Sequence, residues 1–376
     1  MPPSPETKPP ERPGRPGRIE FVDWLRGVAV ALMILAHGSD AWLLPAAKSG
    51  PTYEAIKLLS SIPARLFLFL VGVSAAIQFE AQLSQNRPTA PLRRRMLQRG
   101  FQIILLAYLF RLQEWLLSGC YGGWRVLLRI DILNAIGLAL VLIALVAAPR
   151  GGRRQIAAAL AGAAVLLGLG PVIGPAHFPD WLPSPLTSYL GGQRPMAWFP
   201  LFPWGAWALV GVIVGHWWAA ASRHEPTMRR AVLLGGAAGL GLFVGVRLVW
   251  AMAPWIVRYP SDVEFQMGPG VFFHRLGLMA VLAALGFFWC RALRGRFSVM
   301  KQLGRTSLLI YWIHVDLCYG KLADPVKGRL SAPAAITLVV TLTGLMLAVS
   351  LLKTHTLRPA FSWLRQRRMG CSLPQP

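Results

Sequence analysis

The sequence predicts an all-α fold: a polytopic transmembrane helix bundle of about ten spans, with the N- and C-termini in the cytoplasm. Three observations predict this fold, namely the composition of the chain, the recurrence of long apolar runs and the placement of basic residues. Hydrophobic residues make up 55% of the 376 residues and charged residues only 14%, and the mean hydropathy is +0.48. This composition is typical of membrane helices and excludes an ordinary soluble core.

Long apolar runs recur along the whole chain. Each contains about 20 residues, which is enough for a helix to cross the hydrocarbon core of a bilayer. We expect spans near residues 20–44, 57–80, 96–118, 126–148, 155–174, 198–220, 229–253, 271–293, 301–320 and 332–353. The fifth run is the weakest, because its Ala- and Gly-rich sequence leads into a Pro-rich loop.

Basic residues are unevenly placed between these runs. Lys and Arg outnumber Asp and Glu by 39 to 15, for a net charge of +24, and they cluster in RPGRPGR, RPTAPLRRR, PRGGRR, RALRGR and LRQRR. In the ten-span arrangement all five clusters lie on the side of the N-terminus, and cytoplasmic segments are the ones enriched in Lys and Arg. The charge therefore orients the protein and attracts anionic membrane lipid, and we expect no nucleic-acid partner.

One membrane domain, residues 19–355, is expected between two tails. Residues 1–18 are rich in Pro and Arg and predict a disordered cytoplasmic tail, while residues 356–376 predict a basic cytoplasmic tail. The N-terminal stretch lacks the apolar segment of a cleaved signal peptide, so we expect the first span to act as the insertion signal. The four cysteines have no paired spacing and predict neither a disulfide framework nor a zinc site.

The first span contains an acid, an arginine and a histidine within EFVDWLRGVAVALMILAHGSDAW. On a helix, Arg26 and His37 fall within about 20° of each other, and His37 lies roughly 16 Å farther across the membrane. Asp23 lies three residues before Arg26 and can pair with it on the same stripe. Each residue alone fits a structural role equally well, but ionisable groups on one shared face are typical of a bundle interior or a wet cavity.

Other spans carry ionisable or polar residues at a similar depth from the outer face. They are Arg65, Asp131, Asn134, Arg247 and His314, with Arg111 and Glu114 somewhat closer to that face. A charged group at the bilayer centre costs about 2.5–3.5 kcal/mol, so we expect these side chains to line a common polar cavity open towards the outer leaflet. In the ninth span, Tyr311 and His314 share a stripe, which makes His314 the second candidate for chemistry.

The sequence lacks the common short motifs of nucleotide-binding proteins, hydrolases and metalloproteases. The chain contains no GxGxxG after a strand, no GxxxxGK[ST], no GxSxG and no HExxH, and its scattered histidines predict no metal site. The residues alone leave open an enzyme and a secondary transporter or flippase for a polar or anionic substrate. The lack of visible repeat symmetry counts against the transporter, and a non-catalytic membrane subunit is a third interpretation.

The order of several segments resembles a known group of membrane enzymes. The opening RIEFVDWLRGVAVALMILAH has the Asp, Arg-Gly and His spacing of the acyltransferase-3 class. The later segments are more similar to the heparan-alpha-glucosaminide N-acetyltransferase-like branch, in the order ARLFLFLVGVSAA, RRRMLQRGFQIILL, RIDILNAIGLAL, FPLFPWGAWALVGVIVG and LGRTSLLIYWIH. The resemblance therefore runs from about residue 18 to residue 320.

This resemblance implies a membrane acyltransferase that uses acetyl-CoA as a co-substrate, without a metal, and acts on a sugar or glycan hydroxyl or amine. The lysosomal enzyme that names the branch uses a histidine in the loop after its first span. Residues 38–62 of this chain contain no histidine, so the resemblance to bacterial relatives and to acyltransferase-3 implies that His37 takes the catalytic role. The same resemblance leads us to expect a multi-pass protein of a cell membrane, the bacterial inner membrane.

The spacing of the stripe suggests how the residues divide the work. We hypothesise that Arg26, held by Asp23, binds the anionic end of acyl-CoA near the basic inner surface. His37 then deprotonates the acceptor at the outer face or carries the acyl group itself. The expected substrate-binding residues are Arg65, Asp131, Asn134, Tyr311 and His314. The identity of the acceptor, the length of the acyl chain and the oligomeric state, a homo-oligomer included, stay open at this point.

Overall fold

The structure is a computed structural model of the 376-residue chain. It describes residues 19–147, 151–173, 178–179, 181–191, 197–252, 268–294 and 296–357. The predicted tail 1–18 and all but the first two residues of the tail 356–376 lie outside the described residues. Within the described ranges the regular elements are helices, accompanied by two isolated β-bridges, and this confirms the predicted all-α class.

The helices follow one another along the chain. Their bounds are α1 Glu20–Trp42, α2 Gly50–Ser60, α3 Pro63–Leu83, α4 Ala90–Leu117, α5 Ile132–Leu142, α6 Gly152–Ile173, α7 Ser184–Leu190, α8 Leu201–Ala221, α9 Glu225–Met252, α11 Pro269–Ala292, α12 Val299–Arg305, α13 Ser307–Tyr319 and α14 Ala332–Leu352. In the described part of the chain, eight helical segments are long and apolar enough to cross a membrane. The multi-pass bundle is therefore confirmed, including the weak fifth run, which forms α6.

Two of the ten predicted spans are shorter than expected, and each has a local cause. The predicted span 126–148 becomes α-helical only at Ile132, because Asp131 caps α5 through a capping box with Asn134. The predicted span 301–320 is interrupted at Thr306, whose backbone leaves the helical region (φ −121°, ψ 18°) while its hydroxyl bonds Ser350 at 2.6 Å. The resulting apolar helices, Ile132–Val146 and Ser307–Tyr319, each have fewer than the about 20 residues that an upright span needs.

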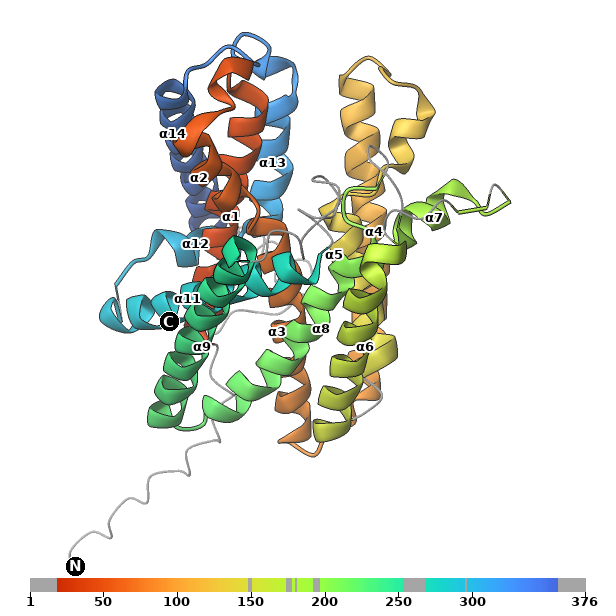
Figure 1. The fold of residues 1–376 in the computed structure, drawn as a ribbon. Helices are drawn as coiled ribbons and strands as arrows, with labels where there is room; N and C mark the ends of the chain where they lie inside the picture. The colour runs from red at the N-terminus through yellow and green to blue at the C-terminus, as the bar shows by residue number, and fades with distance from the viewer. Residues whose placement is uncertain are drawn as a thin grey trace, which may run out of the picture.

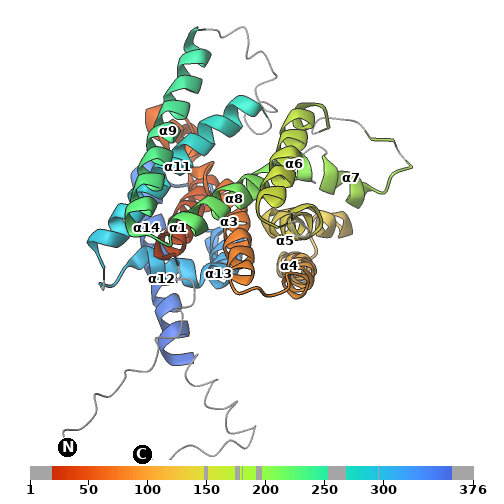
Figure 2. The ribbon, with the colours of Figure 1, turned by 90° about the horizontal axis from the view of Figure 1, so that it is seen from below.

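Helix α1 lies between two apolar clusters. Leu25 and Ala29 on one of its faces belong to a large cluster with α3, α8 and their neighbours, and both are fully buried. Val30 and Ile34 on another face belong to a smaller cluster with α13 and α14. Figures 1 and 2 show this arrangement, with α1 beside α13 and α14 and with α3 and α8 next to α4, α5 and α6. The polar stripe of α1 is thus held at the junction of two packed units.

Glycine allows the closest helix crossings. Gly72 on α3 lies against the backbone of α8, where an added Cβ would overlap the carbonyl oxygen of Ala208. Gly27 on α1 and Gly304 on α12 meet in the same way, against the backbone at Met300 and Asp23. Small residues of this kind let helix backbones approach closely in membranes, where packing replaces the hydrophobic effect.

Helix ends that the predicted topology places on one side do meet. At the outer end, isolated bridges join Leu43 to Leu330 and Ile130 to Ala197. At the inner end, Lys301 pairs with Glu20 at 3.0 Å. A further inner contact joins three helices, since the imidazole of His216 on α8 bonds Glu80 on α3 and Gln155 on α6, each at 2.8 Å. These contacts agree with alternating crossings, while the assignment of the inner side to the cytoplasm stays a prediction.

The glycine crossing predicts how the fold responds to one added methyl group. Gly72→Ala should lower the free energy of unfolding by about 1–3 kcal/mol, because α3 and α8 must move apart to accept the Cβ. Gly344→Ala is the matched control, since no heavy atom lies within 4 Å of an added Cβ on this residue of α14. Thermal unfolding in detergent measures both variants. Equal stability of the two proteins would contradict the close α3–α8 crossing.

Candidate active site

The inner part of the α1 stripe forms the ion pair that its spacing predicts. Arg26 Nη1 donates to Asp23 Oδ1 at 2.9 Å, and Arg26 Nη2 donates to the hydroxyl of Ser74 on α3 at 2.5 Å. Asp23 is 4% exposed, while the side chain of Arg26 keeps 31% of its surface. The carboxylate lies in the first turn of α1, where the helix dipole favours negative charge. Arg26 is therefore held from two sides, with part of its surface open.

The outer part of the stripe brings two histidines together. His37 Nδ1 on α1 lies 3.0 Å from His314 Nε2 on α13, and the two rings are stacked with their centroids 5.1 Å apart. His314 is fully buried and His37 half-buried. Tyr319 places its ring edge against His37, with centroids 5.6 Å apart, and donates its hydroxyl to Asp40 at 2.8 Å. The structure thus joins the first and second candidates for chemistry across two helices.

The hydrogen bonds assign the protons of this pair. His314 Nδ1 lies 2.7 Å from the carbonyl oxygen of Ile310, and because a carbonyl only accepts, this nitrogen carries the hydrogen. In a neutral imidazole, His314 Nε2 is then the acceptor, so His37 Nδ1 must donate to it. The remaining nitrogen, His37 Nε2, keeps its lone pair. The pair therefore orients His37 with a basic nitrogen away from His314, as a carboxylate orients the histidine of a hydrolase triad.

A buried ion cluster lies next to the histidines. Arg111 on α4 donates to Asp131 at 2.7 Å and to Glu114 at 2.5 Å, and it interacts electrostatically with His37. Arg111 and Asp131 are 7% and 5% exposed. Such a pair is held by its hydrogen bonds, because removing one partner leaves the other charge buried and unpaired.

Asp131 and Asn134 also have a structural role at the start of α5. Asp131 accepts from the backbone N–H of Leu133, and the Asn134 side chain accepts from the backbone N–H of Asp131, which starts α5. The amide of Asn134 donates to the hydroxyl of Tyr189 at 2.9 Å. Burial raises the pKa of Tyr189, whose helix α7 lies outside the spans, and its bond with Tyr108 raises the pKa further. Both predicted substrate-binding residues thus have partners within the protein.

Several polar contacts at this level were not predicted. Gln113 on α4 donates to Asp316 on α13 at 2.7 Å and accepts from the indole of Trp312 at 2.9 Å. Tyr311 is buried, with its ring centroid 5.9 Å from that of His314. Helical spacing places Asp316 and His314 on different faces of α13. In the structure, the face that carries Asp316 contacts α4. In the sequence, Gln113 and Asp316 are polar residues within two separate apolar runs. A single sequence does not show that these two runs are neighbours.

Arg65 lies in a different environment from the histidines. Its guanidinium is 4.8 Å from the ring centroid of Trp204 on α8 and donates to the carbonyl oxygen of Ser61. The predicted Arg247 lies over Phe243 of its own helix, 6.0 Å from the ring centroid. The predicted residues therefore form two groups: His37, His314, Tyr311, Asp131 and Asn134 on one side, and Arg65 with the α8 aromatic residue on the other.

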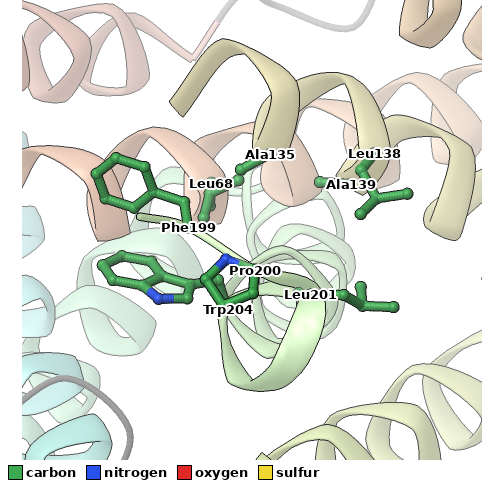
Figure 3. Close-up of a pocket in the computed structure, with 9 residues that line it drawn as sticks. Leu68, Ala135, Leu138, Ala139, Phe199, Pro200, Leu201 and Trp204 are labelled. Atoms are coloured by element: carbon green, nitrogen blue, oxygen red, sulfur yellow. The ribbon is translucent and has the colours of Figure 1, made fainter. Parts of the chain in front are cut away.

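The predicted shared polar cavity takes another form in the structure. The described polar side chains bond directly to one another, because direct pairs avoid the cost of burying each group alone. A small cavity between α3, α5 and α8 is lined by apolar residues, as Figure 3 shows. They are Leu68, Ala135, Leu138, Ala139, Phe199, Pro200, Leu201, Trp204 and Gly205. This cavity adjoins the Trp204 ring and not the histidine pair.

Comparison with known families decides the class of the protein. A family model described as the catalytic domain of heparan-alpha-glucosaminide N-acetyltransferase matches residues 18–242, which is more than half of the chain. The chain belongs to this family. As a heparan-alpha-glucosaminide N-acetyltransferase family member with many apolar helices, it is a multi-pass membrane acetyltransferase. No curated protein matches the chain.

The family match covers one member of the histidine pair and not the other. The matched residues include Asp23, Arg26 and His37 as well as most of α9, whereas His314 and Tyr311 lie beyond residue 242. The structure therefore adds a contact from the C-terminal helices to the acetyltransferase family domain. Its partner, His37, is the histidine that the resemblance implied.

The ion cluster predicts a large effect of one neutral substitution. Asp131→Asn keeps the size and the helix-capping ability of the residue but leaves Arg111 with Glu114 alone. We expect a loss of about 3 kcal/mol in the free energy of unfolding, the lower end of the cost of breaking a buried pair. Asp324→Asn, which breaks the exposed pair with Lys327, is the control and should cost under about 1 kcal/mol. Similar losses in the two variants would contradict a buried, tightly held cluster.

Proposed function

We propose that the protein transfers an acetyl group from cytoplasmic acetyl-CoA to a hydroxyl or amine of a sugar or glycan at the outer face of the membrane. The observation that carries this proposal is the contact between His37 and His314, which orients a basic nitrogen on the same helical stripe as the anchored Arg26. The family match supports acetyl transfer. We propose in addition that acetyl-CoA is the donor, that a sugar or glycan is the acceptor, and that the acetyl group moves from the inner to the outer side of the membrane.

The inner end of the stripe suits the anionic end of acetyl-CoA. Arg26 is fixed by Asp23 and Ser74 and keeps an open part of its surface, so its guanidinium is oriented before a phosphate arrives. Guanidinium–phosphate contacts are among the strong charge-assisted hydrogen bonds of proteins. The basic loops on this side add a long-range attraction for the anionic donor.

The path from Arg26 to His37 is closed by packing. Val30 and Met33 lie between them on the stripe and are 0% and 4% exposed. Arg26 and His37 are separated by about 16 Å along the helix, which an extended pantetheine arm can span. To pass, the arm must displace the contacts between α1 and one of its two apolar clusters.

At the outer end, His37 Nε2 accepts the proton of the acceptor hydroxyl or amine while His37 Nδ1 donates to His314. The acceptor oxygen or nitrogen bonds to the acetyl carbon, the carbon–sulfur bond breaks, and the proton passes to the thiolate of CoA. In the two-step alternative, His37 Nε2 bonds to the acetyl carbon as the carbon–sulfur bond breaks and CoA leaves as its thiolate. The acceptor then bonds to the acetyl carbon, the Nε2–carbon bond breaks, and the freed Nε2 takes the acceptor proton and passes it to the thiolate. Both routes require the lone pair on the same nitrogen.

The remaining predicted residues complete the proposed site. His314 positions His37, Tyr311 packs beside the pair, and Asp131 holds Arg111, whose charge acts on His37. Asn134 fixes Asp131 through the capping box at the start of α5. Arg65 is proposed to bind an anionic part of a substrate at the second group of residues. In this proposal residues 19–355 form one acetyltransferase domain in a bacterial cell membrane, and both tails are cytoplasmic.

The catalytic role of His37 predicts a specific loss. His37→Gln keeps a hydrogen-bonding side chain but removes proton transfer, so kcat should fall by about 10²–10⁴-fold while the affinity for acetyl-CoA changes little. His314→Gln keeps an oxygen that accepts from His37 Nδ1 and should retain more activity than His314→Ala. His224→Gln, an exposed inner-loop histidine, is the control. Near-normal acetyl transfer by His37→Gln would place the chemistry elsewhere.

The anchoring role of Arg26 predicts a loss of binding. Arg26→Gln should raise the dissociation constant of acetyl-CoA roughly ten- to a hundredfold, the effect of losing about 1.5–3 kcal/mol from one charged hydrogen bond. Arg153→Gln changes an exposed basic residue at the start of α6 and is the control for the general field. Binding is measured on purified protein in nanodiscs. If the wild-type protein shows no affinity for acetyl-CoA, the transporter interpretation gains support.

A further inference from the structure

The outer ends of α1 and α13 are joined next to the histidine pair. The indole of Trp42, the last residue of α1, donates to the carbonyl oxygen of Cys318 on α13 at 3.2 Å. The segment after α13 also bonds the end of α1, because the backbone N–H of Leu330 donates to the carbonyl oxygen of Trp42 at 2.9 Å. Figure 1 shows the two helices side by side. Side chains on these two helix ends are therefore held in a fixed relation to His37.

Two polar side chains, Asp40 and Tyr319, lie at this junction. Tyr319, the last residue of α13, donates its hydroxyl to Asp40 Oδ2 at 2.8 Å, and its ring edge lies against His37 with the centroids 5.6 Å apart. Asp40 lies three residues after His37 on α1, so their Cβ atoms are about 5–6 Å apart. The side chain of Asp40 is 68% exposed, and Tyr319 is 38% exposed. Tyr319 thus links His37 to a carboxylate that molecules in the outer solvent can reach.

The Asp40 carboxylate keeps acceptor capacity that the protein does not use. A carboxylate has about four lone-pair positions, and the hydroxyl of Tyr319 occupies one of them. Lys48 Nζ donates to the backbone carbonyl oxygen of Asp40 at 2.7 Å and lies 3.9 Å from Asp40 Oδ1, beyond hydrogen-bonding distance. Among the described residues, Oδ1 therefore pairs with a charge but accepts no hydrogen bond.

The position of this carboxylate is unfavourable for the helix that carries it. Asp40 lies in the last turn of α1, where the helix dipole disfavours a negative charge. Its exposed ion pair with Lys48 is of a kind that contributes little stability. Residues that break a local rule of this sort are expected at functional sites, where the cost to the fold is offset elsewhere. The carboxylate therefore indicates a role in binding.

We propose that Asp40 and Tyr319 bind the sugar acceptor beside His37, with the Asp40 carboxylate accepting hydrogen bonds from the groups next to the reacting one. This inference rests on the proposed acetyl transfer and names the residues that hold its acceptor. A sugar carries hydroxyl or amino groups on neighbouring ring carbons, so one ring can direct one group to His37 Nε2 and the next group to Asp40. These donors match a free carboxylate oxygen, and the apolar face of the ring matches the partly exposed ring of Tyr319.

The charge of Asp40 also sets a preference among sugars. A protonated amino group gives a charge-assisted hydrogen bond to the carboxylate, whereas a hydroxyl gives an ordinary one. Glucosamine should therefore bind more tightly than glucose, from which it differs by one amino group in place of a hydroxyl. Tyr319 is a positioning residue in this proposal, because its hydroxyl orients the carboxylate.

Sugar binding and turnover of acetyl-CoA are measured separately on the purified full-length protein in nanodiscs. Saturation-transfer NMR gives the dissociation constants of glucosamine and glucose. Asp40→Asn should weaken the binding of glucosamine roughly tenfold and that of glucose less, because only the first loses a charge-assisted contact. Tyr319→Phe keeps the ring but frees the carboxylate, and it should weaken both sugars. Asp324→Asn is the same substitution at an exposed residue of the segment after α13, and it should leave both dissociation constants unchanged.

Two further readouts separate binding from a structural role of Asp40. Asp40→Asn removes an unfavourable charge from the end of α1, so the melting temperature of the protein should not fall. In acetyl transfer, the KM for the sugar should rise, while kcat and the KM for acetyl-CoA stay near their wild-type values. A lower melting temperature together with a lower kcat and an unchanged KM for the sugar would overturn the proposal in favour of a structural role.

The outcomes distinguish this inference from the proposed reaction. The inference is overturned if the wild-type protein binds neither sugar, or if Asp40→Asn binds glucosamine as tightly as Asp324→Asn does. Sugar binding that Asp40→Asn weakens, in a wild-type protein that does not consume acetyl-CoA, would support the sugar site and contradict the reaction. Acetyl transfer with the same KM for the sugar in both variants would support the reaction and contradict the site.

Discussion

Charged side chains on membrane helices need partners within the bundle, and this constraint shapes the structure around α1. Asp23 and Arg26 satisfy each other at the inner end, and His37 meets His314 at the outer end. Between them the helix is apolar and contacts two clusters, one with α3 and α8 and one with α13 and α14. Because both polar contacts use side chains from the same stripe, the rotation of α1 is fixed at both ends. The other helices are positioned around this fixed face.

The arrangement separates the two ends of the proposed reaction by a closed layer. An acetyltransferase that takes its donor from one side and its acceptor from the other must pass a large polar molecule without opening a pore. Val30 and Met33 close the stripe of α1 between Arg26 and His37. The broken span of α12 and α13, with its interruption at Thr306, lies beside this stripe and contacts α1 along both parts.

The sequence alone predicts the helical class, the spans and the α1 stripe, because apolar runs and helical spacing are local properties. It also predicts that His37 and His314 lie at one depth. It does not predict the Asp131–Asn134 capping box, because a polar pair at the start of an apolar run has the same pattern whether it binds a ligand or starts a helix. The separation of Arg65 from the histidines depends on which helices are neighbours. Two further hydrogen bonds cannot be predicted for the same reason, because each joins helices far apart in the chain. They are the bonds of Gln113 with Asp316 and of His216 with Glu80.

The central claim is that one stripe of α1 holds the donor from its phosphates to its reacting end. A structure of the protein with CoA bound in a lipid nanodisc tests this claim most directly. The account predicts that the phosphates contact Arg26 and that the sulfur lies within about 4 Å of His37 Nε2, close to the distance at which reacting atoms meet. A CoA sulfur remote from both histidines, or phosphates bound at Arg65 instead of Arg26, would contradict it.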